Sequence, residues 1–112
     1  MRDELLDALG LPATYLGYRY LAFSVSLVRK DEELLLQVSK RLYPAVADHF
    51  RVSPTSVERC IRTAVSRFWN HGNRALLDQL AGYHLVGKPT GSEIIALLAK
   101  GRPTATAAVS GL

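Results

Sequence analysis

The sequence predicts an all-α fold, a compact bundle of about six helices that contains a helix-turn-helix. Apolar residues recur at helical spacing along the chain, and no stretch shows the alternation that is typical of a half-buried strand. N-cap residues, prolines and glycines divide the chain into short helices. The chain has 112 residues, of which 48% are hydrophobic and 21% charged, so it is long enough for one domain with a buried core.

The first part of the chain carries three predicted helices. Residues 3–9 form a short amphipathic helix that ends before Gly10 and Pro12, and residues 14–29 form a longer one. The residues expected on the inner side of the longer helix are Leu16, Tyr20, Phe23, Leu27 and Val28. Asp31 can cap the third helix. The expected inner residues of the third helix are Leu34, Leu35, Val38 and Leu42.

The middle of the chain fits a helix-turn-helix frame of about twenty residues that begins at Tyr43. Pro44 can start the first helix, which runs to Phe50. Ser53 and Pro54 start the second as a hydroxyl N-cap and a first-turn proline, and this helix ends at Asn70. The frame expects burial between the helices at Val46, Phe50, Val52, Val57 and Cys60, and a small residue at Ala47. Arg51 takes the turn position where glycine is commonest, at a cost of about 1 kcal/mol for a positive φ.

Two more helices complete the predicted bundle. Residues 74–80 form a short helix that is closed by Gly82. Thr90 and Glu93 have the spacing of a capping box, which opens a last helix through Leu98. Gly101 and Pro103 end that helix. We therefore expect a helix-turn-helix domain over residues 1–102 and a disordered tail over residues 103–112, which is small and polar.

The positive charge of the chain is concentrated in the helix-turn-helix. The whole chain has 14 lysines and arginines against 10 acids, a net charge of +4. Residues 51–74 contain five arginines and a single acid, Glu58, so this segment carries the entire excess. A basic cluster on a helix favours a polyanionic partner, because each neutralised phosphate releases condensed counterions.

The second helix of the motif separates into a buried and an exposed side. Its apolar stripe consists of Val57, Cys60, Ile61, Ala64, Val65 and Phe68. The opposite side, which we call the recognition face, consists of Thr55, Glu58, Arg59, Arg62 and Ser66, and Ser56 and Thr63 flank it. Arginine can donate two hydrogen bonds to guanine, and glutamate can accept one from cytosine. We predict that Glu58, Arg59 and Arg62 contact bases.

A second set of residues is predicted to contact the DNA backbone or to flank the base contacts: Thr55, Ser56, Thr63, Ser66, Arg67, Arg74 and Lys88. Lys88 completes Gly82-x-x-x-x-Gly87-Lys88, which matches part of a nucleotide-binding loop. Because Pro89 follows where serine or threonine should hold magnesium, we do not expect a nucleotide there.

Several short motifs in order resemble one known family. They are GYRYL (17–21), LYP (42–44), SP-x-x-VER-x-IR (53–62), GN (72–73), GY (82–83) and GKPT-x-SE-x-IALLA (87–99). The chain is similar, over roughly residues 5–99, to the C-terminal DNA-binding (effector) domain of the sporulation initiation master response regulator family. This resemblance implies about six helices around a helix-turn-helix, and sequence-specific binding to short promoter boxes, often as a tandem dimer.

The resemblance also bears on individual residues. The base-contacting positions of the family map onto Glu58, Arg59 and Arg62. Ser56 and Thr63 depart from the family, which often has arginine and histidine there, so the preferred DNA sequence is open. The family domain follows a phosphoacceptor receiver domain; we expect this chain to be either a stand-alone homologue or a piece of a longer protein.

Other function classes find no support in the sequence. The single Cys60 cannot form an intramolecular disulfide, and the three histidines have no metal-ligand spacing among themselves or with it. No serine, histidine and acid suggest a catalytic triad. We expect no enzyme, no metal, no cofactor and no small-molecule ligand. The N-terminus lacks a signal layout and no run spans a bilayer, so we expect a cytoplasmic protein without a membrane partner.

We therefore predict a transcriptional regulator that binds double-stranded DNA at promoter sites and forms at most a weak homodimer, on tandem sites. One alternative is a helical interaction module that modulates a full-length regulator without useful DNA binding. The modest net charge and the serine at position 56 keep this alternative open.

Overall fold

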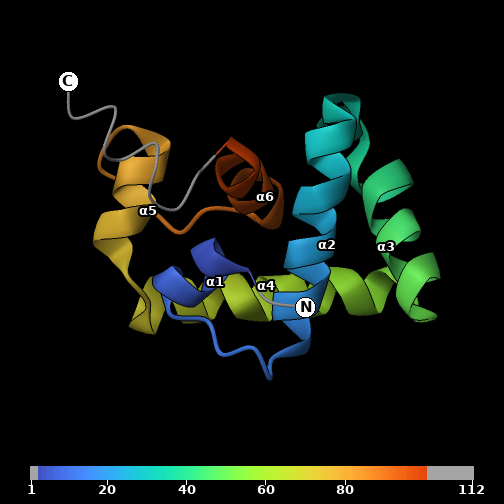
Figure 1. The fold of residues 1–112 in the computed structure, drawn as a ribbon, viewed down its shortest axis with the longest axis horizontal. Helices are drawn as coiled ribbons and strands as arrows, with labels where there is room; N and C mark the ends of the chain where they lie inside the picture. The colour runs from blue at the N-terminus through green and yellow to red at the C-terminus, as the bar shows by residue number, and fades with distance from the viewer. Residues whose placement is uncertain (1–2, 101–112) are drawn as a thin grey trace.

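The computed structural model describes residues 3–100, and over this range the chain is helical without a β-strand. The elements are α1 (Glu4–Leu9), α2 (Leu16–Lys30), a 3₁₀ helix η1 (Glu32–Gln37), a π helix η2 (Val38–Leu42), α3 (Tyr43–Phe50), α4 (Pro54–His71), α5 (Arg74–Ala81) and α6 (Gly91–Lys100). Figure 1 shows α4 along the longest axis of the molecule, with α2 and α3 near one end and α5 near the other. The predicted all-α class is confirmed; the expected tail over residues 103–112 lies outside the described residues.

Side chains cap several helix starts, including those at Asp31, Ser53 and Thr90 that the sequence predicted. The carboxylate of Asp3 accepts hydrogen bonds from the amides of Leu5 and Leu6 at 2.9 and 3.0 Å and starts α1. Gly10 ends α1 in the left-handed region, with φ +92°. The capping box at α6 is complete: the Thr90 amide donates to Glu93 Oε1 at 2.8 Å, and the Glu93 amide donates to Thr90 Oγ1 at 3.2 Å. These helix starts are local in origin, so the sequence located them well.

The longer helix α2 is buried on more sides than the sequence predicted. It packs against α4, α6, η1 and α3. Its buried residues are Gly17, Tyr18, Tyr20, Leu21, Ala22, Ser24, Val25 and Val28. The prediction that Leu16 lies on the inner side is wrong. Leu16 is the first residue of α2, and it is 55% exposed. A single apolar stripe describes a helix with one packing partner, whereas α2 lies between several.

The close crossing of α2 and α4 depends on Gly17. A Cβ atom at this position would lie 2.5 Å from the carbonyl oxygen of Cys60 and 2.8 Å from the Cβ of Ala64. The backbones therefore approach more closely than any larger residue permits. This contact fixes α4 against the core and leaves its opposite side outward.

The segment from Glu32 to Leu42 differs from the single helix that was predicted. The Asp31 carboxylate accepts from the Glu33 amide at 3.1 Å, as expected for a cap, but the chain then winds as η1 and η2 and leads directly into α3. Leu34 and Leu42 are buried, whereas Leu35 and Val38 are only half-buried. The change in winding moves side chains off the stripe that an α-helix would give, which explains the difference.

The helix-turn-helix core follows the prediction with three exceptions, at Cys60, Val52 and Phe50. The residues of α4 that are buried are Val57, Ile61, Ala64, Val65 and Phe68. Cys60 is half-buried at the edge of this stripe, where it packs against the core. Val52, expected between the two helices, is 37% exposed in the turn. Phe50 is half-buried and contacts the rings of Tyr20 and Phe23.

Candidate nucleic-acid interface

The turn between α3 and α4 keeps a left-handed residue although an arginine occupies the position where glycine is commonest, a point that the sequence left open. Arg51 has φ +59° and ψ +47°, the left-handed conformation that glycine adopts most readily. The amide of Val52 then donates to the Ala47 carbonyl at 2.9 Å and closes the end of α3. Ser53 Oγ accepts from the Ser56 amide at 3.1 Å and starts α4. The turn thus sets the direction of α4 relative to α3.

The predicted base-contacting residues all lie on the outer side of α4, in its N-terminal half. Glu58, Arg59 and Arg62 are exposed. Within residues 3–100, none of these three side chains forms an ion pair or a side-chain hydrogen bond. Their charged ends are therefore available to a ligand without first breaking an internal contact.

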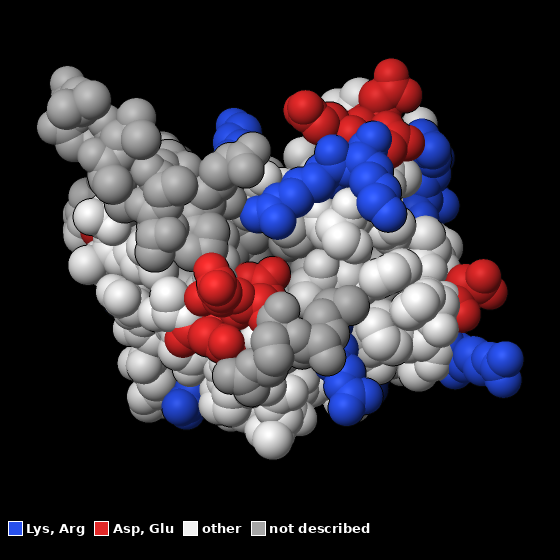
Figure 2. All heavy atoms as spheres, in the orientation of Figure 1, with Lys and Arg blue, Asp and Glu red and all other residues white. Residues whose placement is uncertain are grey.

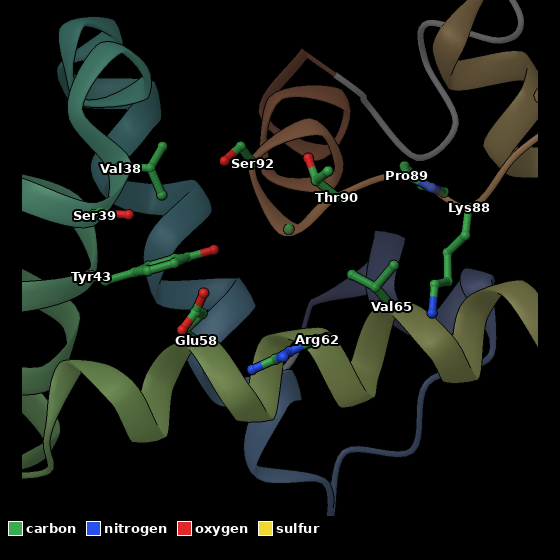
Figure 3. A pocket seen from close by; sticks show the side chains of 11 residues that line it. Val38, Ser39, Tyr43, Glu58, Arg62, Val65, Lys88, Pro89, Thr90 and Ser92 are labelled. Atoms are coloured by element: carbon green, nitrogen blue, oxygen red, sulfur yellow. The ribbon is translucent and has the colours of Figure 1, made fainter.

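A loop from the other half of the chain reaches the recognition face. Lys88 Nζ donates to Ser66 Oγ at 3.1 Å across 22 positions of sequence, and Figure 3 shows the lysine pointing from its loop toward α4. The loop is held at its base by Asp78, whose carboxylate accepts from the Leu85 amide at 2.9 Å and lies 2.8 Å from His84 Nδ1. Both contacts lower the pKa of the Asp78 carboxyl, the amide of Leu85 most strongly. The sequence offered Lys88 as a candidate, but only the fold places it beside α4.

Three of the five clustered arginines lie outside the recognition face: Arg51 in the turn, and Arg67 and Arg74 farther along the chain. Arg74 stacks over the ring of Trp69, 3.5 Å from its centroid, near the C-terminal end of α4. Arg67 is half-buried, and its buried Nε has no hydrogen-bond partner among the described residues. Arg67 lies seven residues after Cys60, on the same side of α4 as the crossing with α2. The charge cluster in the sequence is therefore not one continuous patch.

A pocket of about 380 Å³ opens beside the recognition face. Figure 3 shows that η2, the start of α3, the first turns of α4 and the start of α6 surround it. Its lining residues are Val38, Ser39, Tyr43, Glu58, Arg62, Val65, Lys88, Pro89, Thr90, Gly91 and Ser92. Sequence reasoning missed Tyr43, Thr90 and Ser92 as site residues. The capping box at Thr90 was the one local signal, since it marks a helix start whose amides need partners.

Tyr43 is the most enclosed polar side chain of this pocket. Its side chain is 7% exposed, and within residues 3–100 its hydroxyl makes no hydrogen bond. Burial and, to a lesser extent, the nearby Glu58 carboxylate raise the pKa of the Tyr43 phenol. The phenol therefore stays protonated at neutral pH and remains a hydrogen-bond donor.

The face on which α1 lies carries a cluster of acidic side chains among scattered lysines and arginines (Figure 2). In Figure 1, α1 lies in front of α4, and Figure 2 shows acidic side chains gathered over α1 on this face. The acids at α1 are Asp3, Glu4 and Asp7.

A helix-turn-helix whose second helix presents exposed arginines places the chain among the helix-turn-helix DNA-binding domains. Comparison with known families names it further. Residues 3–101 match the family described as Sporulation initiation factor Spo0A C terminal, and the chain belongs to this family. The family is a helical DNA-binding domain of a transcription regulator of sporulation and is not an enzyme class.

Two further features of residues 3–100 concern metal binding and membrane spans. No group of three or more histidine, cysteine, aspartate or glutamate side chains is arranged to hold a metal ion in this range. The helices described here are too short or too polar for any of them to cross a membrane.

Proposed function

We propose that this domain binds double-stranded DNA in a sequence-specific manner, with Glu58, Arg59 and Arg62 contacting base edges in the major groove. The observation that carries the proposal is the free state of these three side chains on the outer side of α4. An arginine that already forms an ion pair must break it to bind a base. Arg59 and Arg62 have no ion pair among residues 3–100, so they can bind a base without this cost.

The proposed roles follow from the chemistry of each group. Each guanidinium can donate two hydrogen bonds to O6 and N7 of guanine, and the Glu58 carboxylate can accept from N4 of cytosine. A carboxylate on a surface that faces phosphates weakens nonspecific binding. Glu58 therefore favours selective contact with bases over simple charge attraction.

The backbone contacts are proposed for Thr55, Ser56, Thr63, Ser66 and Lys88 around this face, and for Arg74 beyond the C-terminal end of α4. Lys88 is the strongest of them, because its loop is anchored by Asp78 and its ammonium group already lies against α4. We do not include Arg67, since its half-buried position points to a role in supporting α4.

We also propose that two copies bind side by side on tandem sites, while the free protein is a monomer. Three base-contacting residues cover only a few base pairs, and helix-turn-helix proteins commonly gain specificity by occupying two half-sites. Sedimentation of the free protein and of its complexes with one-site and two-site duplexes tests this. A tight dimer without DNA would contradict it.

The experiment for DNA binding compares a duplex selected from a random pool with a scrambled duplex, by fluorescence anisotropy at two salt concentrations. We expect the affinity to fall steeply with salt, with a log–log slope of about −0.9 per neutralised phosphate. Arg59→Ala or Arg62→Ala should cost about 1–3 kcal/mol on the selected duplex and little on the scrambled one. Arg19→Ala is the matched control, because Arg19 is exposed on α2 and belongs to neither proposed contact set.

The outcomes separate the proposal from the interaction-module alternative. Equal losses on both duplexes would show that the arginines only attract phosphates. Absence of binding at low salt would favour a domain that acts through a protein partner.

A further inference from the structure

The pocket beside the recognition face contains a hydroxyl donor on a largely enclosed side chain, Tyr43, which is 7% exposed. The hydroxyl of Tyr43 points into the pocket toward the start of α6, as Figure 3 shows, and no described residue accepts its hydrogen bond. The hydroxyl faces the open pocket, so water is its available partner there. A charged acceptor that enters the pocket would replace this water with a stronger, charge-assisted hydrogen bond.

The start of α6 provides more donors at the same place. In the capping box, the Thr90 hydroxyl accepts from the Glu93 amide. This leaves the amides of Gly91 and Ser92, which have no hydrogen-bond acceptor among residues 3–100. These amides lie at the positive end of the dipole of a ten-residue helix, and both residues line the pocket.

The charged side chains around the pocket are balanced in number. Lys88, Arg62 and Glu58 line it, and the Glu93 carboxylate lies at the start of α6, where it accepts from the Thr90 amide. In Figure 3, Glu58 lies on the α3 side of the pocket, and Lys88 comes from the loop that leads into α6. An anion at the start of α6 would therefore lie near the Gly91 and Ser92 amides and on the side of the pocket away from Glu58, as Figure 3 shows.

We propose that this pocket binds one phosphodiester group of the DNA backbone, held by the Tyr43 hydroxyl and the Gly91 and Ser92 amides, with the Lys88 ammonium at the other end of the pocket. The inference rests on the proposed DNA binding. Glu58 and Arg62 belong both to the pocket lining and to the recognition face, so a strand that passes the recognition face also passes the pocket mouth. A phosphate fixed at this point would set the register of α4 in the groove.

Tyr43→Phe tests the proposal, because it removes the hydroxyl and leaves the packed ring. We expect the affinity to fall about tenfold, equally on the selected and scrambled duplexes, since a hydrogen bond to a charged phosphate is lost. Tyr20→Phe is the matched control: Tyr20 is also buried but does not line the pocket. Unchanged affinity of Tyr43→Phe would overturn the proposal. A loss that depends on one cytosine would also overturn it, because Tyr43 would then act through Glu58.

A second variant covers the case in which Tyr43→Phe does not fold. Gly91→Ala places a Cβ atom 2.7 Å from the Tyr43 hydroxyl oxygen, so it should fill part of the site and give a similar uniform loss. Full affinity of a folded Gly91→Ala protein would count against the site.

Neutral methylphosphonate groups, placed one at a time along the selected duplex, identify the phosphate. At one position the wild-type protein should lose affinity about tenfold, and Tyr43→Phe should lose nothing further there. If the two losses multiply at every position, the hydroxyl contacts no phosphate. Failure of the wild-type protein to bind any duplex would instead refute the proposed function, so the two failures are distinguishable.

Inorganic phosphate distinguishes the DNA backbone from a free anion as the ligand. In the DNA complex, the backbone should already occupy the pocket. Added phosphate should therefore leave the NMR amide signals of Gly91 and Ser92 unchanged. A phosphate-dependent shift of these signals in the complex would assign the pocket to a free anion and overturn the proposal.

Discussion

Replacement of Gly17 by alanine should destabilise the domain, although the same change in an exposed helix would stabilise it. Gly17 lies in α2 where that helix crosses α4, and an added Cβ would lie 2.5 Å from the Cys60 carbonyl oxygen. An ordinary contact between carbon and oxygen is about 3.3 Å or longer. The two helices must therefore move apart by several tenths of an ångström, against the packing of the α4 core residues.

The magnitude follows from two opposing effects. Alanine in place of glycine within a helix contributes up to about 1 kcal/mol of stability. Inserting a methyl group into a packed interface costs about 1–3 kcal/mol. The obstacle at Gly17 is the α4 backbone, which cannot rotate away as a side chain could, so the cost should lie near the upper end. We expect a net loss of about 1–2 kcal/mol and a fall in Tm of about 5–15 °C.

Urea unfolding followed by the fluorescence of Trp69, the single tryptophan, measures this loss. Gly87→Ala is the matched control, because a Cβ atom there has nothing within 4 Å and should change stability little. If Gly17→Ala is as stable as the wild-type protein, the inferred close approach of α2 and α4 is wrong. The DNA affinity of the folded variant should also fall, since α4 would shift.

Two further predictions concern the turn and the loop. Arg51→Gly should raise the free energy of unfolding by about 0.5–1 kcal/mol in urea titrations, because φ is +59° there; an unchanged or lower stability would show that the arginine side chain contributes more than the strain costs. The pKa of Asp78 is lowered by the Leu85 amide and by His84, so the charged carboxylate stabilises the fold above its unfolded pKa, and this contribution is lost as pH falls through the lower folded value. Asp78→Asn should therefore be less stable than the wild-type protein at neutral pH, with a difference that shrinks below about pH 4; a difference that does not change with pH would exclude the charge as its cause.

Much of the fold and of the recognition face was determined by the sequence itself. Ser53, Thr90 and Asp31 mark helix starts because a cap is a contact between residues only two or three positions apart. The outward position of Glu58, Arg59 and Arg62 follows from the 3.6-residue period of a single uninterrupted helix. The sequence placed Arg51 in the turn, but the structure was needed to show that it adopts the left-handed conformation.

The tertiary structure decided what depends on elements distant in sequence. The exposure of Leu16 and the half-burial of Arg67 depend on how α2 lies against its neighbours. The contact between Lys88 and Ser66 joins two elements that local spacing cannot relate. The pocket exists because η2, α3, α4 and α6 converge at Tyr43. A helical period fixes which residues share a face of one helix, but only packing fixes which other helix, loop or cavity that face meets.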